Sequence, residues 1–379
     1  MKNNRLEHLD GIRGIAAFSV MLGHMRWPSV ISHLPFLTSV TLWVDFFFVL
    51  SGFVIARSYF DRLAEGMTVA SFMMRRFARL YPLHLLTLLA ALAYELVKWK
   101  VFGAVSIDAK HLPFENNNLF SFACTALLIH ALGVLPASYW NGPSWSISAE
   151  FYVYLVFALC VALSRRWRAL FWTMLIGLQV LSFVILASYS GGRSVETDYG
   201  FFRCVLGFGL GVIVEHFCRQ REIPTVSRKT WLNVLMAGVV ITLISVPVEG
   251  TPITLLAPFV FAIAVWLLVQ HRGGIVERLL RSRVCQTLGA LSYSIYMTHL
   301  FFHGLLYNVW RVLSRQELFH SGWGVVVLDE GLTVAFVSIV LLVSWSCYRR
   351  VELPAQRWLN QLADRPCRAA VPPTVEVAA

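Results

Sequence analysis

An arginine and a histidine, Arg13 and His24, are separated by ten residues within the first apolar stretch of this sequence. On a helix that rises about 1.5 Å and turns about 100° per residue, they lie about 16 Å apart on one face. Imidazole can take a proton from a hydroxyl near neutral pH, and guanidinium binds phosphate groups well. The pair could therefore combine general-base chemistry with anion binding. Taken singly, Arg13 could reach lipid headgroups and His24 could be a boundary residue.

A carboxylate, Glu150, follows the run Pro143-Ser144-Trp145-Ser146-Ile147-Ser148-Ala149 near the start of a later apolar stretch. A glutamate can orient a histidine and stabilise its charged form, so we expect Glu150 to support His24. Alternatively, Glu150 complements the dipole of a helix whose cap is Ser146 or Ser148. The two interpretations are compatible, and we predict His24 and Glu150 as the catalytic residues.

An arginine cluster, Arg75, Arg76 and Arg79, lies in the run Arg75-Arg76-Phe77-Ala78-Arg79-Leu80-Tyr81-Pro82. Arginine suits bidentate binding of phosphate, so the cluster could hold a phosphorylated ligand together with Arg13. The alternative is ordinary anchoring of a membrane helix by cytoplasmic positive charge.

Weaker candidates share only an apolar setting in which a polar side chain could face a cavity. Asp45 could instead be exposed at an interface, and His299 could simply bond a neighbouring helix. No metal-ligand motif, phosphate loop or nucleophile elbow is present, and the seven cysteines have no regular spacing. We therefore predict no metal site. The cavity candidates are Asp10, Asp45, Ser51, Trp145, Ser146 and His299.

Composition indicates the membrane class of protein. Hydrophobic residues make up 57% of the 379 residues and charged residues 14%, against about 25% charged in a soluble domain. Mean hydropathy is +0.64. The net charge of +11 comes from short basic clusters between apolar runs, which is typical of cytoplasmic loops and not of a nucleic-acid-binding face.

Apolar runs of about 20 residues predict an all-α integral membrane protein with about ten transmembrane helices in one bundle. We expect a membrane domain over 1–360 and a disordered cytoplasmic tail over 361–379. The predicted spans are 11–27, 40–58, 80–99, 147–163, 169–189, 200–217, 231–248, 252–270, 286–309 and 325–347.

Basic residues predict the orientation of these spans. With the N-terminus in the cytoplasm, ten spans place the clusters around Arg57 to Arg79, Arg165, Arg219, Arg272 and Arg349 inside. An extra crossing by the apolar run 119–136 would move the Arg165 cluster outside, and the next two clusters would follow it. We therefore predict that 119–136 does not span and is re-entrant or lies along the outer face. The same topology puts His24 and Glu150 at similar depth near the outer side.

The chain resembles an acyltransferase family 3 protein, the family of bacterial membrane O-acyltransferases that modify surface and secreted carbohydrates. Six blocks carry the resemblance in the right order, from about Leu6 to Trp358. These blocks are Leu9-Asp10-Gly11-Ile12-Arg13-Gly14 with His24, Val44 to Phe53, Arg75 to Pro82, Trp145 to Phe151, Leu288 to Tyr296 with His299, and Val351-Glu352-Leu353-Pro354.

The resemblance implies a ten-helix core in the bacterial inner membrane. It would transfer an acyl group, most often acetyl, from cytoplasmic acyl-CoA to a hydroxyl of a carbohydrate or glycolipid. Acyl-CoA is then a donor substrate and no cofactor stays bound. Arg13, Arg75, Arg76 and Arg79 would hold the CoA phosphates, and His24 would act as general base. Ser51 and Ser146 are conceivable nucleophiles without an evident base, so we expect direct transfer. The rival class is a transporter or flippase for a lipid-linked or sugar substrate.

Overall fold

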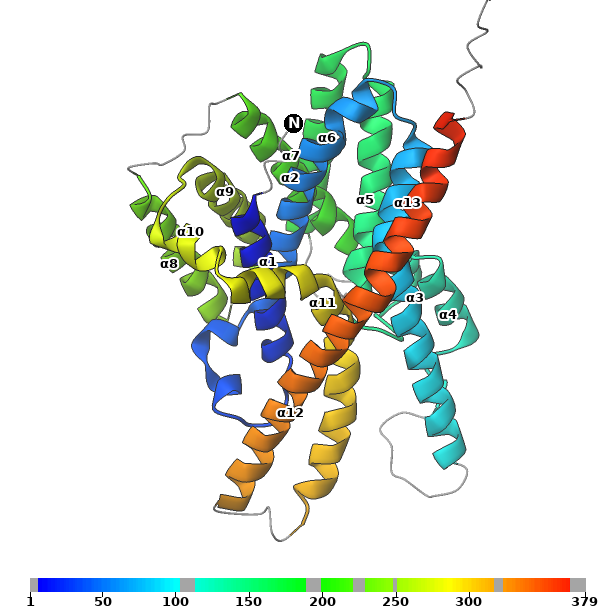
Figure 1. Cartoon of the computed structure of the whole chain (residues 1–379), viewed down its shortest axis with the longest axis vertical. Helices are drawn as coiled ribbons and strands as arrows, with labels where there is room; N and C mark the ends of the chain where they lie inside the picture. The colour runs from blue at the N-terminus through cyan, green and yellow to red at the C-terminus, as the bar shows by residue number, and fades with distance from the viewer. Residues whose placement is uncertain are drawn as a thin grey trace, which may run out of the picture.

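The computed structural model describes residues 6–102, 113–188, 199–220, 229–247, 251–316 and 323–368, and these form a bundle of helices without a strand (Figure 1). The predicted all-helical class is therefore confirmed for that part of the chain. In chain order the helices are α1 (Glu7–Gly23), α2 (Trp43–Ala64), α3 (Val69–Phe102), α4 (Leu119–Ala126), α5 (Ser144–Leu163), α6 (Arg168–Ala187), α7 (Gly200–Arg219), α8 (Trp231–Ser245), α9 (Ala257–Gln270), α10 (Ile275–Leu280), α11 (Arg283–Leu313), α12 (Trp323–Cys347) and α13 (Leu353–Arg368).

Seven of these helices are long and apolar enough to cross a membrane, and the protein is a multi-pass membrane protein. They are α2, α3, α5, α6, α7, α9 and α12. Of the other three predicted spans, α1 and α8 have 17 and 15 residues, fewer than the about 20 that a perpendicular span needs. The third, α11, has 31 residues. The total of ten spans therefore stays a prediction.

The apolar run 119–136 is broken into two short pieces. Its helix α4 has eight residues, which cover about 12 Å of a hydrocarbon core of about 30 Å. The chain then reverses at Leu128, where φ is 58°, and continues as an irregular π-helical turn over His130–Val134. Side chains hold this backbone: Ser148 donates to the Leu128 carbonyl, and His84 contacts the Thr125 carbonyl at 2.9 Å. The segment is thus too short to span, as the basic residues predicted, and the side from which it enters stays a prediction.

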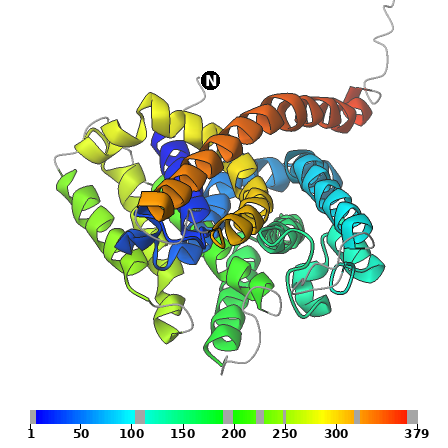
Figure 2. The ribbon, with the colours of Figure 1, turned by 90° about the horizontal axis from the view of Figure 1, so that it is seen from below.

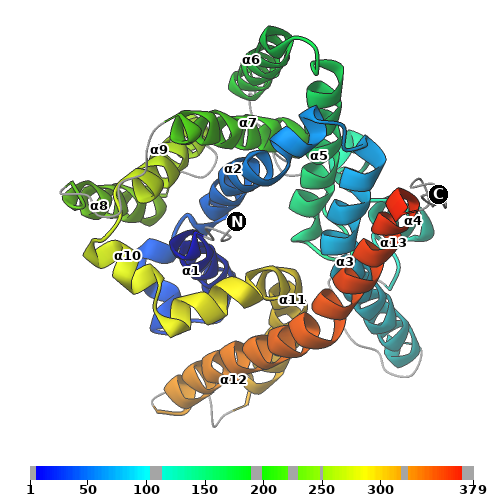
Figure 3. The ribbon, with the colours of Figure 1, turned by 45° about the horizontal axis from the view of Figure 1, so that its top comes forward.

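Helix α1, which carries Arg13, lies in the middle of the bundle and packs chiefly on α11, while α2 packs chiefly on α7 (Figure 3). Glycines allow the close approach of α1 and α11. A Cβ added to Gly14 would overlap the backbone of Gly289, and one added to Gly289 would overlap the Asp10 carbonyl. Small residues at such crossings let membrane helices meet backbone to backbone.

We expect Gly289→Val to lower the free energy of unfolding by about 1–3 kcal/mol, because the added side chain forces α1 away from α11. The contact between the Arg13 guanidinium and the Gly289 carbonyl, 3.0 Å long, would be lost as well. Gly331→Val in α12 is the matched control, since an added Cβ there meets nothing within 4 Å. The measurement is the midpoint of unfolding in detergent. Equal losses in the two variants would contradict the packing argument.

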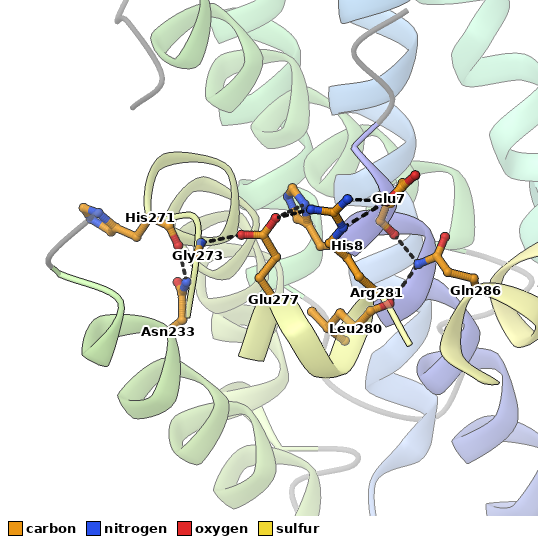
Figure 4. Close-up of polar contacts among 9 residues, drawn as sticks. All are labelled: Glu7, His8, Asn233, His271, Gly273, Glu277, Leu280, Arg281 and Gln286. Atoms are coloured by element: carbon orange, nitrogen blue, oxygen red, sulfur yellow. Dashed lines mark hydrogen bonds and ion pairs between the residues drawn. The ribbon is translucent and has the colours of Figure 1, made fainter. Parts of the chain in front are cut away.

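The N-terminal end of α1 is fixed by polar contacts to α10 and α11 (Figure 4). Arg281 donates to the Glu7 carboxylate at 2.9 Å, and Gln286 donates to the Glu7 carbonyl at 2.7 Å. Arg281 also pairs with Glu277 at 3.6 Å. These contacts hold the register of α1 and therefore the depth at which Arg13 lies.

Helices α12 and α13 run as one long bent rod along the outside of the bundle (Figure 2). A π-helical turn, Tyr348–Glu352, joins them and buries Glu352 against the bundle. Helix α13 continues to Arg368, so the structure corrects the predicted start of the tail at 361. Apolar residues at 355, 358, 359 and 362 recur at helical spacing, which favours continuation of the helix past 361. Residues 369–379 lie outside the described residues.

Candidate active site

A cavity of about 180 Å³ opens between α1, α2, α3, α5 and α11. It brings together polar side chains from helices that are far apart in the sequence, most of them predicted as site residues. The predicted residues that line it are Arg13, Ser51, Arg76, Arg79, Ser146 and Glu150. Arg75, although predicted with Arg76, is not part of the lining. We call this the arginine cavity.

The three arginines of this cavity differ in how far their charge is already compensated. Arg79 donates to Glu352 at 2.5 Å, and Arg13 lies 3.4 Å from Asp10. Arg76 instead donates to the neutral Tyr59 hydroxyl at 2.7 Å, and its guanidinium carbon lies 4.7 Å from the centre of that ring. The Arg76 side chain is therefore preorganised by a hydroxyl partner, whereas Arg79 and Arg13 are paired with carboxylates. Asp10 serves here as the partner of Arg13.

Glu150 is the carboxylate of the arginine cavity. The Tyr154 hydroxyl donates to it at 2.6 Å, and the Ser51 hydroxyl lies 2.9 Å from the Tyr154 hydroxyl. Glu150 also interacts electrostatically with Arg76 and Arg79. Tyr154 was not predicted, although its position four residues after Glu150 on one helix face is a signal that the sequence does contain.

The expected contact of Glu150 with His24 is not formed, which corrects the sequence interpretation. Glu150 lies six residues into α5, or about 9 Å below its start, whereas His24 directly follows the last residue of α1. The opposite directions predicted for α1 and α5 place both residues in the outer half of the membrane. Direction alone does not determine the depth of each residue to within one or two helical turns, nor how α5 is rotated about its axis. Tyr154 takes the place that His24 was expected to have.

His24 lines a second, smaller cavity of about 80 Å³ with Trp145 and His299. We call this the histidine cavity. The His24 Nδ1 lies 2.7 Å from the Val20 carbonyl. Because a carbonyl oxygen can only accept, Nδ1 carries the proton, and Nε2 of the neutral ring is left as the basic nitrogen. The ring centres of His24 and His299 are 4.9 Å apart.

Three neighbouring cavities share residues in their linings. The arginine and histidine cavities share Val44 and Tyr296 in their linings. The histidine cavity shares Gly142 and Leu300 with a third cavity of about 230 Å³, which we call the distal cavity. The distal cavity is lined by aromatic and amide side chains that were not predicted from the sequence: Tyr94, Asn117, Trp140, Asn141 and Phe301. His24 lines the middle one of these three cavities.

Asp45 lines none of these three cavities. It is 2% exposed and forms a bidentate pair with Arg203 of α7, with distances of 2.8 Å and 2.7 Å. Arg203 also lies over the Trp145 ring, 5.7 Å from its centre. Asp45 thus fixes the wall of the histidine cavity through Arg203 and Trp145. The sequence does contain a signal for this pair, which is Arg203 within an apolar run. A charged side chain inside a membrane helix needs a partner, and Asp45 is that partner.

We expect Asp45→Asn to lower the free energy of unfolding by about 3–5 kcal/mol, because it removes the carboxylate charge that pairs with the largely buried Arg203 guanidinium. The control is Asp61→Asn, which breaks a pair with Arg219 whose side chains are 48% and 40% exposed. An exposed pair contributes less than about 1 kcal/mol. Denaturant unfolding in detergent measures both. Similar losses in the two variants would show that burial does not set the strength of the Asp45 pair.

Comparisons with known proteins point to one family. A family model described as an acyltransferase domain matches residues 6–349. Acyltransferase MdmB of Streptomyces mycarofaciens is 26% identical over 401 residues, covering 99% of this chain and 97% of that protein. Protein 2 in picA locus of Rhizobium radiobacter is 36% identical over 166 residues, covering 42% of this chain and 81% of that protein. No solved structure matches the chain.

Proposed function

Since this chain belongs to the acyltransferase domain family, we propose that it is a membrane-embedded O-acyltransferase that uses acyl-CoA as donor and a carbohydrate or glycolipid hydroxyl as acceptor. The observation that carries the proposal is that the two cavities are direct neighbours. A cavity lined by three arginines adjoins a cavity lined by His24, and Val44 and Tyr296 belong to both linings. A long phosphorylated donor fits such an arrangement, with its anionic head at the arginines and its reactive end at the histidine.

At the donor end, Arg76 and Arg13 would bind the CoA phosphates. Charge-assisted hydrogen bonds from guanidinium groups suit this role. Arg79, already paired with Glu352, would supply positive potential and hold the turn between α12 and α13. Glu150 is proposed here as a positioning residue of the donor end, since it bonds Tyr154 and interacts with Arg76. The arm of the donor would occupy the arginine cavity.

At the reacting end, the His24 Nε2 would take the proton of the acceptor hydroxyl. The oxygen then attacks the thioester carbonyl carbon, the carbon–sulfur bond breaks, and CoA leaves as the thiol with the proton that His24 held. Charges and atoms balance without a further group. The proton on Nδ1 is held by the Val20 carbonyl, which supports the tautomer that this step needs.

The proposal includes an orientation. The N-terminus, the start of α3 and the arginine cavity would face the cytoplasm of a bacterium, where acyl-CoA is made, with both chain ends on that side of the inner membrane. The distal cavity would face outward. Basic residues around Arg57, Arg165, Arg272 and Arg349 support this assignment through the preference of cationic loops for the cytoplasm.

Mass spectrometry of surface glycans and glycolipids from cells with and without the gene tests the function. We expect the cells without the gene to lack one acyl group, 42 Da for acetyl, on a specific glycan or lipid. Complementation with the gene should restore the acyl group. Identical acylation in both strains would refute the proposed acceptor class.

A further inference from the structure

His299 contains a hydrogen-bond acceptor that the mechanism above does not use. Its side chain is fully buried, and its Nδ1 lies 2.7 Å from the Tyr296 carbonyl. Since a carbonyl can only accept, Nδ1 carries the proton. The other ring nitrogen, Nε2, is buried and has no hydrogen-bond partner among the residues that the structure describes. It lies at the tip of the ring, away from the α11 backbone that holds Nδ1.

A buried acceptor without a donor is costly, at about 1–3 kcal/mol, and most buried polar groups in proteins have a partner. The position of His299 suggests why its Nε2 is left without a donor. His299 lines the histidine cavity together with His24, and the two ring centres are 4.9 Å apart. A donor group on a bound molecule would satisfy Nε2 and recover that free energy.

Two histidines of the same tautomer therefore border one cavity. His24 and His299 each hold a proton on Nδ1 through a main-chain carbonyl, and each leaves Nε2 as an acceptor. A reacting hydroxyl brings a single proton, which His24 takes. The second acceptor requires a second donor, and that donor must lie close to the first because the cavity is only about 80 Å³.

We propose that His299 is a specificity-determining residue, whose Nε2 accepts a hydrogen bond from a second hydroxyl next to the one that is acylated. The enzyme then prefers acceptors with neighbouring hydroxyls, as on a sugar ring, over acceptors with one. The inference rests on the proposed function. The distal cavity adjoins this site, because Leu300, the residue after His299, lines both cavities, and such a ring would occupy that side.

Another histidine of α11 provides a matched control. His303 is also buried, and within the described part of the chain its Nε2 also has no hydrogen-bond partner. Its ring, however, stacks on Trp27 at 5.7 Å and belongs to neither the histidine nor the distal cavity. A general effect of removing a buried imidazole from α11 would thus appear in both variants, and an effect on the acceptor would appear only at His299.

The experiment measures release of CoA from acetyl-CoA by the purified protein with cyclohexanol or cis-1,2-cyclohexanediol as acceptor. The two alcohols differ by one neighbouring hydroxyl. We expect the wild type to favour the diol by about tenfold or more in kcat/KM, the scale of one hydrogen bond to a buried group. In His299→Leu the preference should fall to about twofold or less, while His303→Leu keeps it. His299→Gln, whose amide oxygen can accept, should recover part of it.

The ratio of the two rates is independent of how much of a variant is folded, so partial misfolding does not obscure the result. An unchanged ratio in His299→Leu, or no preference in the wild type, would overturn the proposal. Failure of the proposed function is distinguishable, because the wild type would then release no CoA with either alcohol or with a glycan extract. Release with the extract but without diol preference overturns the role of His299 alone.

Discussion

Replacing His24 by alanine is expected to reduce acyl transfer by about 10²–10⁴-fold, the usual contribution of a general base. The imidazole is half-buried, lines the histidine cavity and presents Nε2, since Nδ1 is held by the Val20 carbonyl. Alanine removes the proton acceptor and leaves the arginine cavity intact. The KM for acyl-CoA should therefore change little while kcat falls. The measurement is acyl-CoA-dependent CoA release with acceptor present.

His33→Ala is the matched control for this variant. The His33 Nδ1 contacts the carbonyl four residues earlier, that of Ser29, at 2.7 Å, as the His24 Nδ1 contacts that of Val20. His33 is exposed and lines none of the three cavities. It should keep wild-type activity. Retained transfer in a folded His24→Ala protein would remove His24 from the mechanism.

Replacing Arg76 by alanine is expected to weaken acyl-CoA binding by about 10- to 100-fold, which corresponds to the about 1.5–3 kcal/mol of a hydrogen bond to a charged group. Arg76 lines the arginine cavity, and its guanidinium is held in place by Tyr59 without a carboxylate bond. Calorimetric titration of the purified protein with acyl-CoA measures the change. Added salt should weaken binding of acyl-CoA to the wild type more than to the variant, because the variant lacks one charge contact with the donor that salt can screen.

Arg75→Ala provides the control for Arg76→Ala, since Arg75 is its direct neighbour on α3 and is not part of the cavity lining. Both changes remove one positive charge from the same helix turn. We expect Arg75→Ala to change the affinity by less than about threefold, because Arg75 is not part of the cavity lining and would act on the donor only at a distance. Equal losses for the two variants would mean that overall charge, and not the cavity, attracts the donor.

The apolar runs predicted most helices, because a membrane span can be recognised from one continuous stretch of apolar residues without knowledge of its neighbours. The family resemblance is confirmed by the family model. Helix α3 begins at Val69 and not near 80, since the arginine-rich segment is a good helix former that an apolarity criterion does not recognise. The run 119–136 was correctly separated from the spans by the placement of basic residues, which is a constraint on the whole chain.

Pairing between helices was less predictable. Arg13 and His24 were expected on one face of α1, and they line neighbouring cavities that share Val44 and Tyr296. The partners Arg203 of Asp45 and Tyr154 of Glu150 depend on how helices rotate against each other, which hydrophobicity alone does not determine. The unsatisfied Nε2 of His299 likewise arises only once α1 and α11 are packed.

The central claim, that a donor at the arginine cavity acylates an acceptor at His24, is tested most directly in proteoliposomes. Purified protein would receive isotope-labelled acetyl-CoA together with glycan and lipid extract from cells that lack the gene. The account predicts that label appears on a hydroxyl of the extract, one acyl group for each CoA thiol released, and that His24→Ala abolishes both. Movement of a glycan or lipid across the membrane without CoA release would contradict it and indicate a transporter.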